Sequence, residues 1–120
     1  MQREIEYLKD KDIVLITTSG TYILAEEVET LRRLMAKLTE CNCNKCLFDH
    51  RKTHVIAKTL ESYDRSRLYQ EIVSNRTIRA AIVLRELHAD YQFYETTVRN
   101  RGWDVKIFDA YDTAMEWLTE

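Results

Sequence analysis

Proline is absent from this 120-residue chain, and glycine occurs only at Gly20 and Gly102. So low a content of both residues excludes a flexible linker, a low-complexity tract or an internal repeat. It also excludes the glycine-rich loops that cradle phosphate in P-loop and dinucleotide-binding proteins. An undivided chain of this length is predicted to form one domain, spanning residues 1–120.

Long apolar runs are missing as well. None approaches the ~20 apolar residues that a membrane-spanning helix needs, and Met1 is not followed by the apolar stretch of a signal peptide. The formal net charge is −2, and acidic and basic residues are interspersed, so the charge pattern does not favour nucleic acid or an anionic membrane surface. We therefore expect a cytoplasmic protein without membrane insertion and without nucleic acid as a partner.

The apolar residues that are present recur in two patterns, one typical of strands and one typical of helices. Short apolar runs predict five strands, at Ile5–Leu8, Ile13–Ile16, Cys46–Phe48, Ala80–Leu84 and Val105–Phe108. Helical spacing predicts four helices, within residues 24–38, 60–72, 90–102 and 112–118. The short polar connection between the first two strands implies an antiparallel hairpin. The predicted order is ββαβαβαβα, an α/β fold with a mixed, mostly parallel sheet and an N-terminal β-hairpin.

Local signals mark the ends of the last two helices. Asp90 is predicted to cap the third helix, and Gly102 to end it in a left-handed conformation. Asp109 or Asp112 is predicted to cap the final helix. The apolar side chains predicted to form the buried face of that helix are Ala114, Trp117 and Leu118.

The order of elements and two segments resemble the SpoIIAA-like or STAS-like bacterial proteins. Residues 45–51 read as a strand that ends in Asp-x-Arg, and residues 101–109 contain Gly-x-x-Val-x-Ile-Phe before an Ala-x-x-Trp-Leu helix. The resemblance covers nearly the whole chain and looks closest to the mostly uncharacterised stand-alone branch of the group. It implies a SpoIIAA-like fold, related in shape to CRAL-TRIO lipid-transfer domains, and a role in binding rather than catalysis.

The resemblance does not extend to the phosphorylation site of the group. The anti-sigma factor antagonists of this group are phosphorylated on a Ser preceded by Asp, in the loop that enters the helix after the central strand. Residues 48–62 contain no Asp-Ser pair. The switch is therefore not carried over to the nearby hydroxyls of Thr53, Thr59 or Ser62.

Polar side chains are expected to meet beyond the carboxyl ends of the parallel strands, where sheets of this kind bind partners or ligands. Ser19 and Thr21 follow one buried run, and Asp49 and Arg51 follow another. We predict that these four residues form the polar wall of a binding site. A structural alternative is that Asp49 accepts hydrogen bonds from loop N–H groups or from Arg51.

Three cysteines are crowded into one short segment, unlike the spread cysteines of a disulfide framework. Cys41, Cys43 and Cys46 have spacings seen in metal knuckles, and His50 would be a fourth zinc ligand. The favoured interpretation is that Cys46 is a small core residue and that Cys41 and Cys43 are loop residues. His50 and His54 are likewise interpreted as solvated loop residues.

No motif in the sequence predicts a catalytic residue or a cofactor. It contains neither the Gly-x-Ser-x-Gly of a nucleophile elbow nor a His-Glu-x-x-His zinc helix. The leading hypothesis is a non-enzymatic STAS-like interaction or regulatory module with a protein partner. An alternative is a carrier of a small apolar or amphipathic ligand, suggested by the CRAL-TRIO shape and the seven tyrosines. A cysteine-based metal or redox protein is the third hypothesis, and a homodimer is left open.

Overall fold

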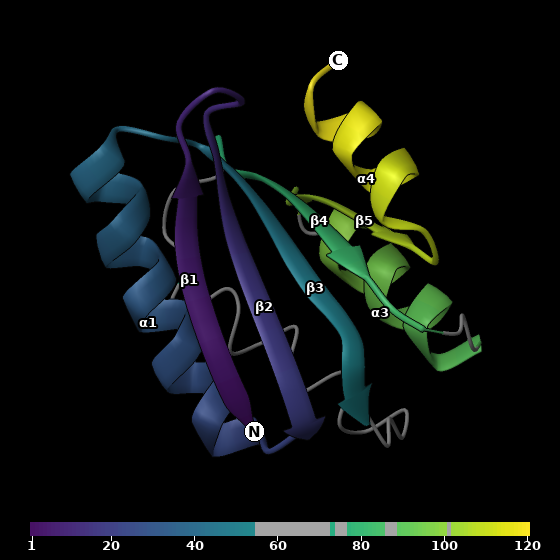
Figure 1. Ribbon diagram of the computed structural model, residues 1–120. Helices are drawn as coiled ribbons and strands as arrows, with labels where there is room; N and C mark the ends of the chain where they lie inside the picture. The colour runs from purple at the N-terminus through teal and green to yellow at the C-terminus, as the bar shows by residue number, and fades with distance from the viewer. Residues whose placement is uncertain (55–72, 74–76, 86–88, 101) are drawn as a thin grey trace.

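The computed structural model of the chain describes residues 1–54, 73, 77–85, 89–100 and 102–120. Its five strands form one sheet in the order β1-β2-β3-β4-β5 (Figure 1). The strands are β1 (Gln2–Leu8), β2 (Ile13–Thr21), β3 (Lys45–His54), β4 (Arg79–Val83) and β5 (Asp104–Phe108). The helices in the described part are α1 (Leu24–Cys41), α3 (Ala89–Asn100) and α4 (Tyr111–Leu118). The helix predicted within residues 60–72 lies outside the described residues.

The direction of the strands confirms the predicted α/β class. β1 pairs antiparallel with β2, whereas β2 through β5 pair parallel with their neighbours. The sheet is therefore mixed and mostly parallel, with an antiparallel hairpin at its N-terminal end. The tip of the hairpin is closed by Tyr7, whose hydroxyl donates a 2.6 Å hydrogen bond to Asp12, a residue with a positive φ of 55°.

The two faces of the sheet are covered unequally. α1 and α3 pack on one face, where Leu31 and Leu34 of α1 and Val98 of α3 meet Val14 and Ile16 of β2 in one buried cluster. Of the described helices, only α4 packs on the opposite face, over β3, β4 and β5 (Figure 1). On that face no described helix lies over β1 or over the C-terminal half of β2.

β2 shows why a strand covered on both faces reads as an unbroken apolar run. Val14 and Ile16 face α1, whereas Ile13 and Leu15 belong to the cluster beneath α4. Strand side chains alternate between faces, so Thr17 and Ser19 continue the α4 side of β2. Thr18 continues the α1 side.

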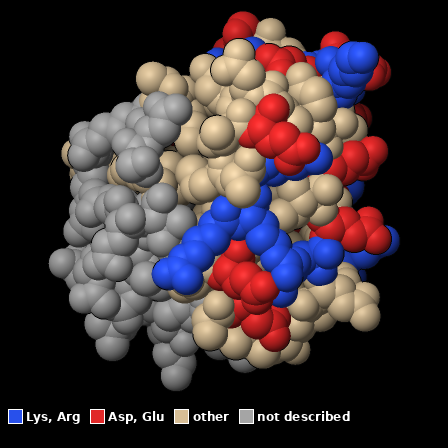
Figure 2. Space-filling model, turned by 90° about the vertical axis from the view of Figure 1, so that its left-hand side faces the viewer, with Lys and Arg blue, Asp and Glu red and all other residues tan. Residues whose placement is uncertain are grey.

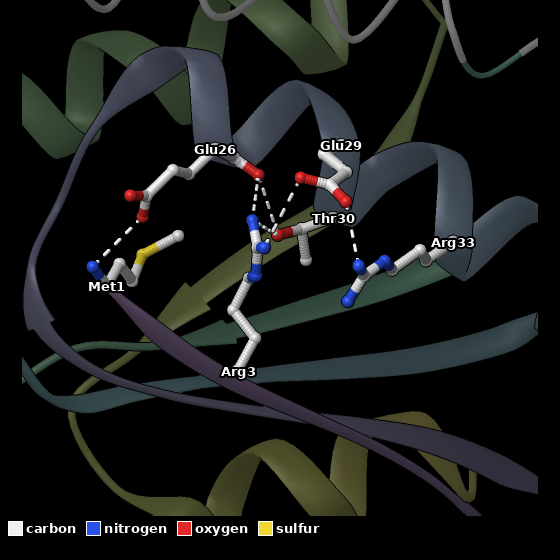
Figure 3. A network of polar contacts seen from close by, with 6 residues as sticks. All are labelled: Met1, Arg3, Glu26, Glu29, Thr30 and Arg33. Atoms are coloured by element: carbon white, nitrogen blue, oxygen red, sulfur yellow. Dashed lines mark hydrogen bonds and ion pairs between the residues drawn. The ribbon is translucent and has the colours of Figure 1, made fainter.

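α1 is also attached to β1 by polar contacts. Figure 3 shows Arg3 of β1 reaching α1, where its guanidinium donates to the Glu26 carbonyl at 2.6 Å and to the Thr30 hydroxyl at 3.2 Å. Glu29 lies 3.4 Å from Arg3 and 2.7 Å from Arg33. Seen from the α1 side, acidic and basic side chains are intermixed rather than gathered by sign (Figure 2).

The end of β3 differs from the sequence prediction. We expected the strand to end near Asp49 and to leave His50 and His54 in a loop, but β3 continues to His54 and buries His50. β2 is likewise longer than its apolar run and pairs with this extension as far as Thr21 and His54. Backbone pairing between the two extensions replaces the hydrogen bonds that water would make in a loop.

The predicted helix caps were wrong in two places. Asp90 lies inside α3 rather than before it, and α4 begins after Ala110, so neither Asp109 nor Asp112 is its N-cap. Asp112 instead lies in the first turn of α4, where its negative charge interacts favourably with the helix dipole and so stabilises the helix. The positive φ of 90° at Gly102 confirms the predicted left-handed end of α3.

The apolar face of α4 is confirmed only in part. Ala114 and Leu118 are fully buried, and Met115 joins them. Trp117 is half-buried rather than enclosed. Its ring lies 5.7 Å from that of Phe108, and the guanidinium of Arg79 stacks 3.8 Å above it. Trp117 therefore covers the edge of the buried cluster and remains partly exposed to solvent.

Candidate functional site

The candidate site lies on the C-terminal halves of β2 and β3, on the α4 side of the sheet. Thr17 pairs with Asp49, and the next paired residues are Ser19 and Lys52. β3 therefore contains one residue more than β2 between these two pairs, which makes a β-bulge. Such a bulge bends a strand and re-aims its side chains. It falls at the point where the sequence changes from apolar to polar.

Asp49 and Arg51 form a bidentate ion pair next to this bulge. Nε and Nη2 of Arg51 each donate to a different carboxylate oxygen of Asp49 at 2.8 Å, and the Arg51 backbone N–H adds a 3.2 Å hydrogen bond. Asp49 is buried whereas Arg51 is exposed. The hydrogen bond from the Arg51 guanidinium lowers the pKa of Asp49, so the carboxylate is held in its charged form.

Arg51 also connects the site to α4. Its guanidinium lies 5.2 Å from the centre of the Tyr111 ring, within the range of a cation–π contact. Asp49 raises the pKa of Arg51, mainly through its hydrogen bond, with smaller contributions from Tyr111 and Asp112. The pair therefore connects the bulge in β3 to the start of α4.

Beside the pair is a hollow with a volume of about 470 Å³, which we call the polar hollow. Its lining residues are Gln2, Arg3 and Glu4 of β1, Thr17, Thr18 and Ser19 of β2, and Lys52 of β3. It lies on the part of the sheet that no described helix covers. Ser19, one of the predicted site residues, is part of the lining. Thr21 is exposed at the end of β2 and does not line the hollow.

A second polar group lies on the opposite face of the same strands, and the sequence analysis missed it. The Thr18 hydroxyl is 2.5 Å from Nδ1 of His50 and 2.5 Å from the Thr53 hydroxyl, and all three residues are buried. The ring of His50 also lies 5.7 Å from that of Phe48. Threonine is common in strands, so Thr18 and Thr53 could have indicated that β2 and β3 continue beyond their apolar runs.

The cysteines do not converge on a metal site. Cys46 is fully buried, which confirms its predicted place in the core, and burial raises the pKa of its thiol. Cys43, expected in a loop, is buried as well, and its thiol donates to the carbonyls of Asp12 and Lys45. Cys41 is the last residue of α1. Among the described residues, no group of three or more His, Cys, Asp or Glu side chains is placed to hold a metal ion.

No helix in the described part of the chain is long and apolar enough to cross a membrane. The sequence matches no family model and no curated protein.

Solved structures do match the fold. An anti-sigma factor antagonist from Mycobacterium paratuberculosis aligns with a TM-score of 0.64 at 9% identity, over 99% of this chain and 94% of that chain. An uncharacterised protein from Shewanella loihica with a SpoIIAA-like fold aligns at 0.57 and 19%, over 98% and 92%. Unphosphorylated SpoIIAA, an anti-sigma factor antagonist, aligns at 0.51 and 11%, over 93% and 92%. The chain therefore has a SpoIIAA-like fold, which confirms at the level of the fold the resemblance found in the sequence.

Proposed function

We propose that this chain is a non-enzymatic, STAS-like interaction module that binds a protein partner through the polar hollow and the adjoining Asp49–Arg51 pair. The observation that carries the proposal is the unequal covering of the sheet. α4 lies over β3, β4 and β5, whereas the neighbouring strands present hydroxyl, amide and charged side chains on the same face. Polar side chains on an accessible, rigid sheet are suited to recognising another surface.

The structural neighbours support a regulatory or interaction role. Two of them are named as anti-sigma factor antagonists, a name that describes action on another protein. Fold alone does not determine function, so the proposal for this chain depends on its own residues at the carboxyl ends of β2 and β3.

Asp49 at the site, and two of the three cysteines at the other end of the sheet, are poor candidates for reactive groups. The Asp49 carboxylate accepts three hydrogen bonds from Arg51, and the guanidinium lowers its pKa, which makes it a weaker general base. Burial raises the pKa of the Cys43 and Cys46 thiols, so both are held in the unreactive protonated form. These contacts favour binding over catalysis.

The alternative of an apolar-ligand carrier gains no support from the polar hollow. An apolar ligand requires a cavity lined mainly by hydrophobic and aromatic side chains. The hollow is lined instead by Gln2, Glu4, Thr17, Ser19 and Lys52, together with Arg3 and Thr18. Such a lining is suited to polar groups of a partner.

A site-specific cross-linking experiment tests the proposed surface. A photo-reactive amino acid is placed at Ser19, in the hollow, and as a matched control at Glu40, which is exposed on α1. In cells of the source organism we expect a defined protein adduct from position 19 and none of that adduct from position 40. Equal labelling at both positions, absence of an adduct at position 19, or turnover by the purified protein that depends on Asp49 would overturn the proposal.

A further inference from the structure

The strand register arranges in two rows the side chains of the sheet face that no described helix covers. Gln2 pairs with Ser19, which pairs with Lys52, so the first row presents an amide, a hydroxyl and an ammonium group. Glu4 pairs with Thr17, which pairs with Asp49, so the second row presents a carboxylate, a hydroxyl and the carboxylate bound by Arg51. The two rows run side by side across β1, β2 and β3.

Two opposite charges occupy diagonal corners of this grid. Strands are spaced about 4.8 Å apart and alternate residues about 6.8 Å apart, which separates the Cα atoms of Glu4 and Lys52 by roughly 12 Å. Both residues are exposed, and among the described residues neither has an ion-pair partner. By contrast, the charges of Asp49 and Arg51 already satisfy one another. The hollow thus offers one anionic and one cationic group to a ligand.

We propose that the polar hollow recognises a protein segment that presents a basic side chain to Glu4 and an acidic side chain to Lys52. This inference rests on the proposed function and specifies the chemistry of the partner. The hydroxyls of Thr17 and Ser19 lie between the two charges, and the amide of Gln2 lies beside Glu4; these groups can donate to carbonyl groups and accept from N–H groups of a peptide backbone.

The spacing of the charges decides between classes of ligand. An α-amino acid carries its ammonium and carboxylate on one carbon, so it spans only a small part of the roughly 12 Å between the Cα atoms of Glu4 and Lys52. Phosphate would meet Lys52 but would be repelled by Glu4 and by Glu6, which follows on the same face of β1. In an extended peptide, side chains two residues apart project about 7 Å from one another on one face, and the long side chains of Lys, Arg and Glu cover the remaining distance.

A peptide selection on charge-reversed variants tests the inference. Random 12-residue peptides displayed on phage are selected against the parent protein and the variants Glu4→Lys and Lys52→Glu. The matched controls, Glu40→Lys and Arg32→Glu, change the net charge equally at exposed positions of α1, on the opposite face of the sheet. All four variants are first checked for the melting temperature of the parent.

Peptides selected on the parent and on both controls should contain basic and acidic residues together. Glu4→Lys should deplete the basic residues, Lys52→Glu should deplete the acidic residues, and each should weaken binding of the best parental peptide about tenfold. Binding of that peptide should also shift the backbone amide NMR signals of Thr17 and Ser19. Peptides of a single sign, enrichment unchanged by the two hollow variants, or no enrichment above a blank surface would each overturn the inference.

The two proposals fail separately. A partner cross-linked at Ser19, combined with peptide selections that ignore Glu4 and Lys52, would leave the interaction surface intact and reject the charge pattern. The expected peptide preference, combined with no adduct at Ser19 in cells, would reject the proposed function and retain the charge preference of the hollow.

Discussion

The Asp49–Arg51 pair combines two roles that the sequence analysis treated as alternatives. Its two 2.8 Å hydrogen bonds link two residues of β3 at the bulge, which is a structural role. The same pair lies on the sheet face that carries the polar hollow, with Arg51 exposed. A partner that binds this face would therefore meet a guanidinium whose position is already set by Asp49.

At the level of single residues, Asp49→Asn should lower stability in a pH-dependent way. The pKa of Asp49 is lowered in the folded protein, so the pair stabilises the fold above the unfolded-state pKa of about 3.9 and loses this effect as the pH falls through the folded-state value. At pH 7 we expect a loss of about 1 kcal/mol, because the pair is only partly shielded from solvent. Thermal unfolding of parent and variant between pH 3 and pH 7 measures the difference.

The control for this prediction is Asp10→Asn, which removes an exposed carboxylate from the β1–β2 connection. It should leave the melting temperature unchanged at every pH. If Asp49→Asn and Asp10→Asn behave alike at pH 7, the ion pair contributes nothing measurable to the fold. If the difference between Asp49→Asn and the parent does not shrink as the pH falls from 7 to 3, its cause is not the charge of Asp49.

Among the elements, β3 shows where sequence reasoning reached its limit. The apolar run at Cys46–Phe48 predicted a buried strand, and the structure confirms it. The following polar residues gave no periodic signal, because their burial depends on partners more than 30 residues earlier in the chain. His50 and Thr53 are satisfied by Thr18 of β2, which only the folded sheet brings within hydrogen-bonding distance.

The start of α1 is a second element whose sequence is not optimal for stability. Its N-cap is Ile23, an exposed residue with an extended backbone and an apolar side chain that cannot accept a hydrogen bond from the first turn. Ile23→Ser would supply an acceptor, whereas Ile23→Ala would not. We expect the serine variant to be more stable than the alanine variant by about 1 kcal/mol in urea unfolding. Equal stabilities would show that water already satisfies these N–H groups.

Truncating an enclosed residue of α4 should cost more stability than truncating Trp117, which covers the edge of the cluster. Leu118 is fully buried, so Leu118→Ala should cost about 3 kcal/mol through lost contacts and the cavity left behind. Trp117 is half-buried, so Trp117→Ala should cost less, about 2 kcal/mol, including its cation–π contact with Arg79. Chemical unfolding of both variants gives the comparison, with Glu116→Ala as an exposed control. A larger loss for Trp117 than for Leu118 would contradict this assignment.

At the scale of the whole molecule, the hydrophobic pattern was sufficient for the described architecture. The mixed, mostly parallel sheet and its antiparallel hairpin follow from apolar runs and connection lengths, and both are confirmed. The candidate site was less accessible to this reasoning. Asp49 and Arg51 were predicted because they follow a buried strand, but Gln2, Glu4 and Lys52 carry no motif. Only the strand register brings them together.

The position of β1 at the end of the sheet has a consequence for self-association. A terminal strand offers unpaired backbone groups to a second copy of the chain, which is a common route to dimers and aggregates.

If two copies of β1 paired antiparallel about Ile5, Glu4 of each copy would face Glu6 of the other, and like charges directly opposite one another are destabilising. The double variant Glu4→Thr and Glu6→Thr should therefore associate at concentrations where the parent sediments as a monomer. A parent that already sediments as a dimer joined through β1 would contradict this. Glu4, the carboxylate proposed to bind a basic side chain of the partner, would thus have a second role: together with Glu6 it would prevent the sheet from being extended by a second copy of the chain.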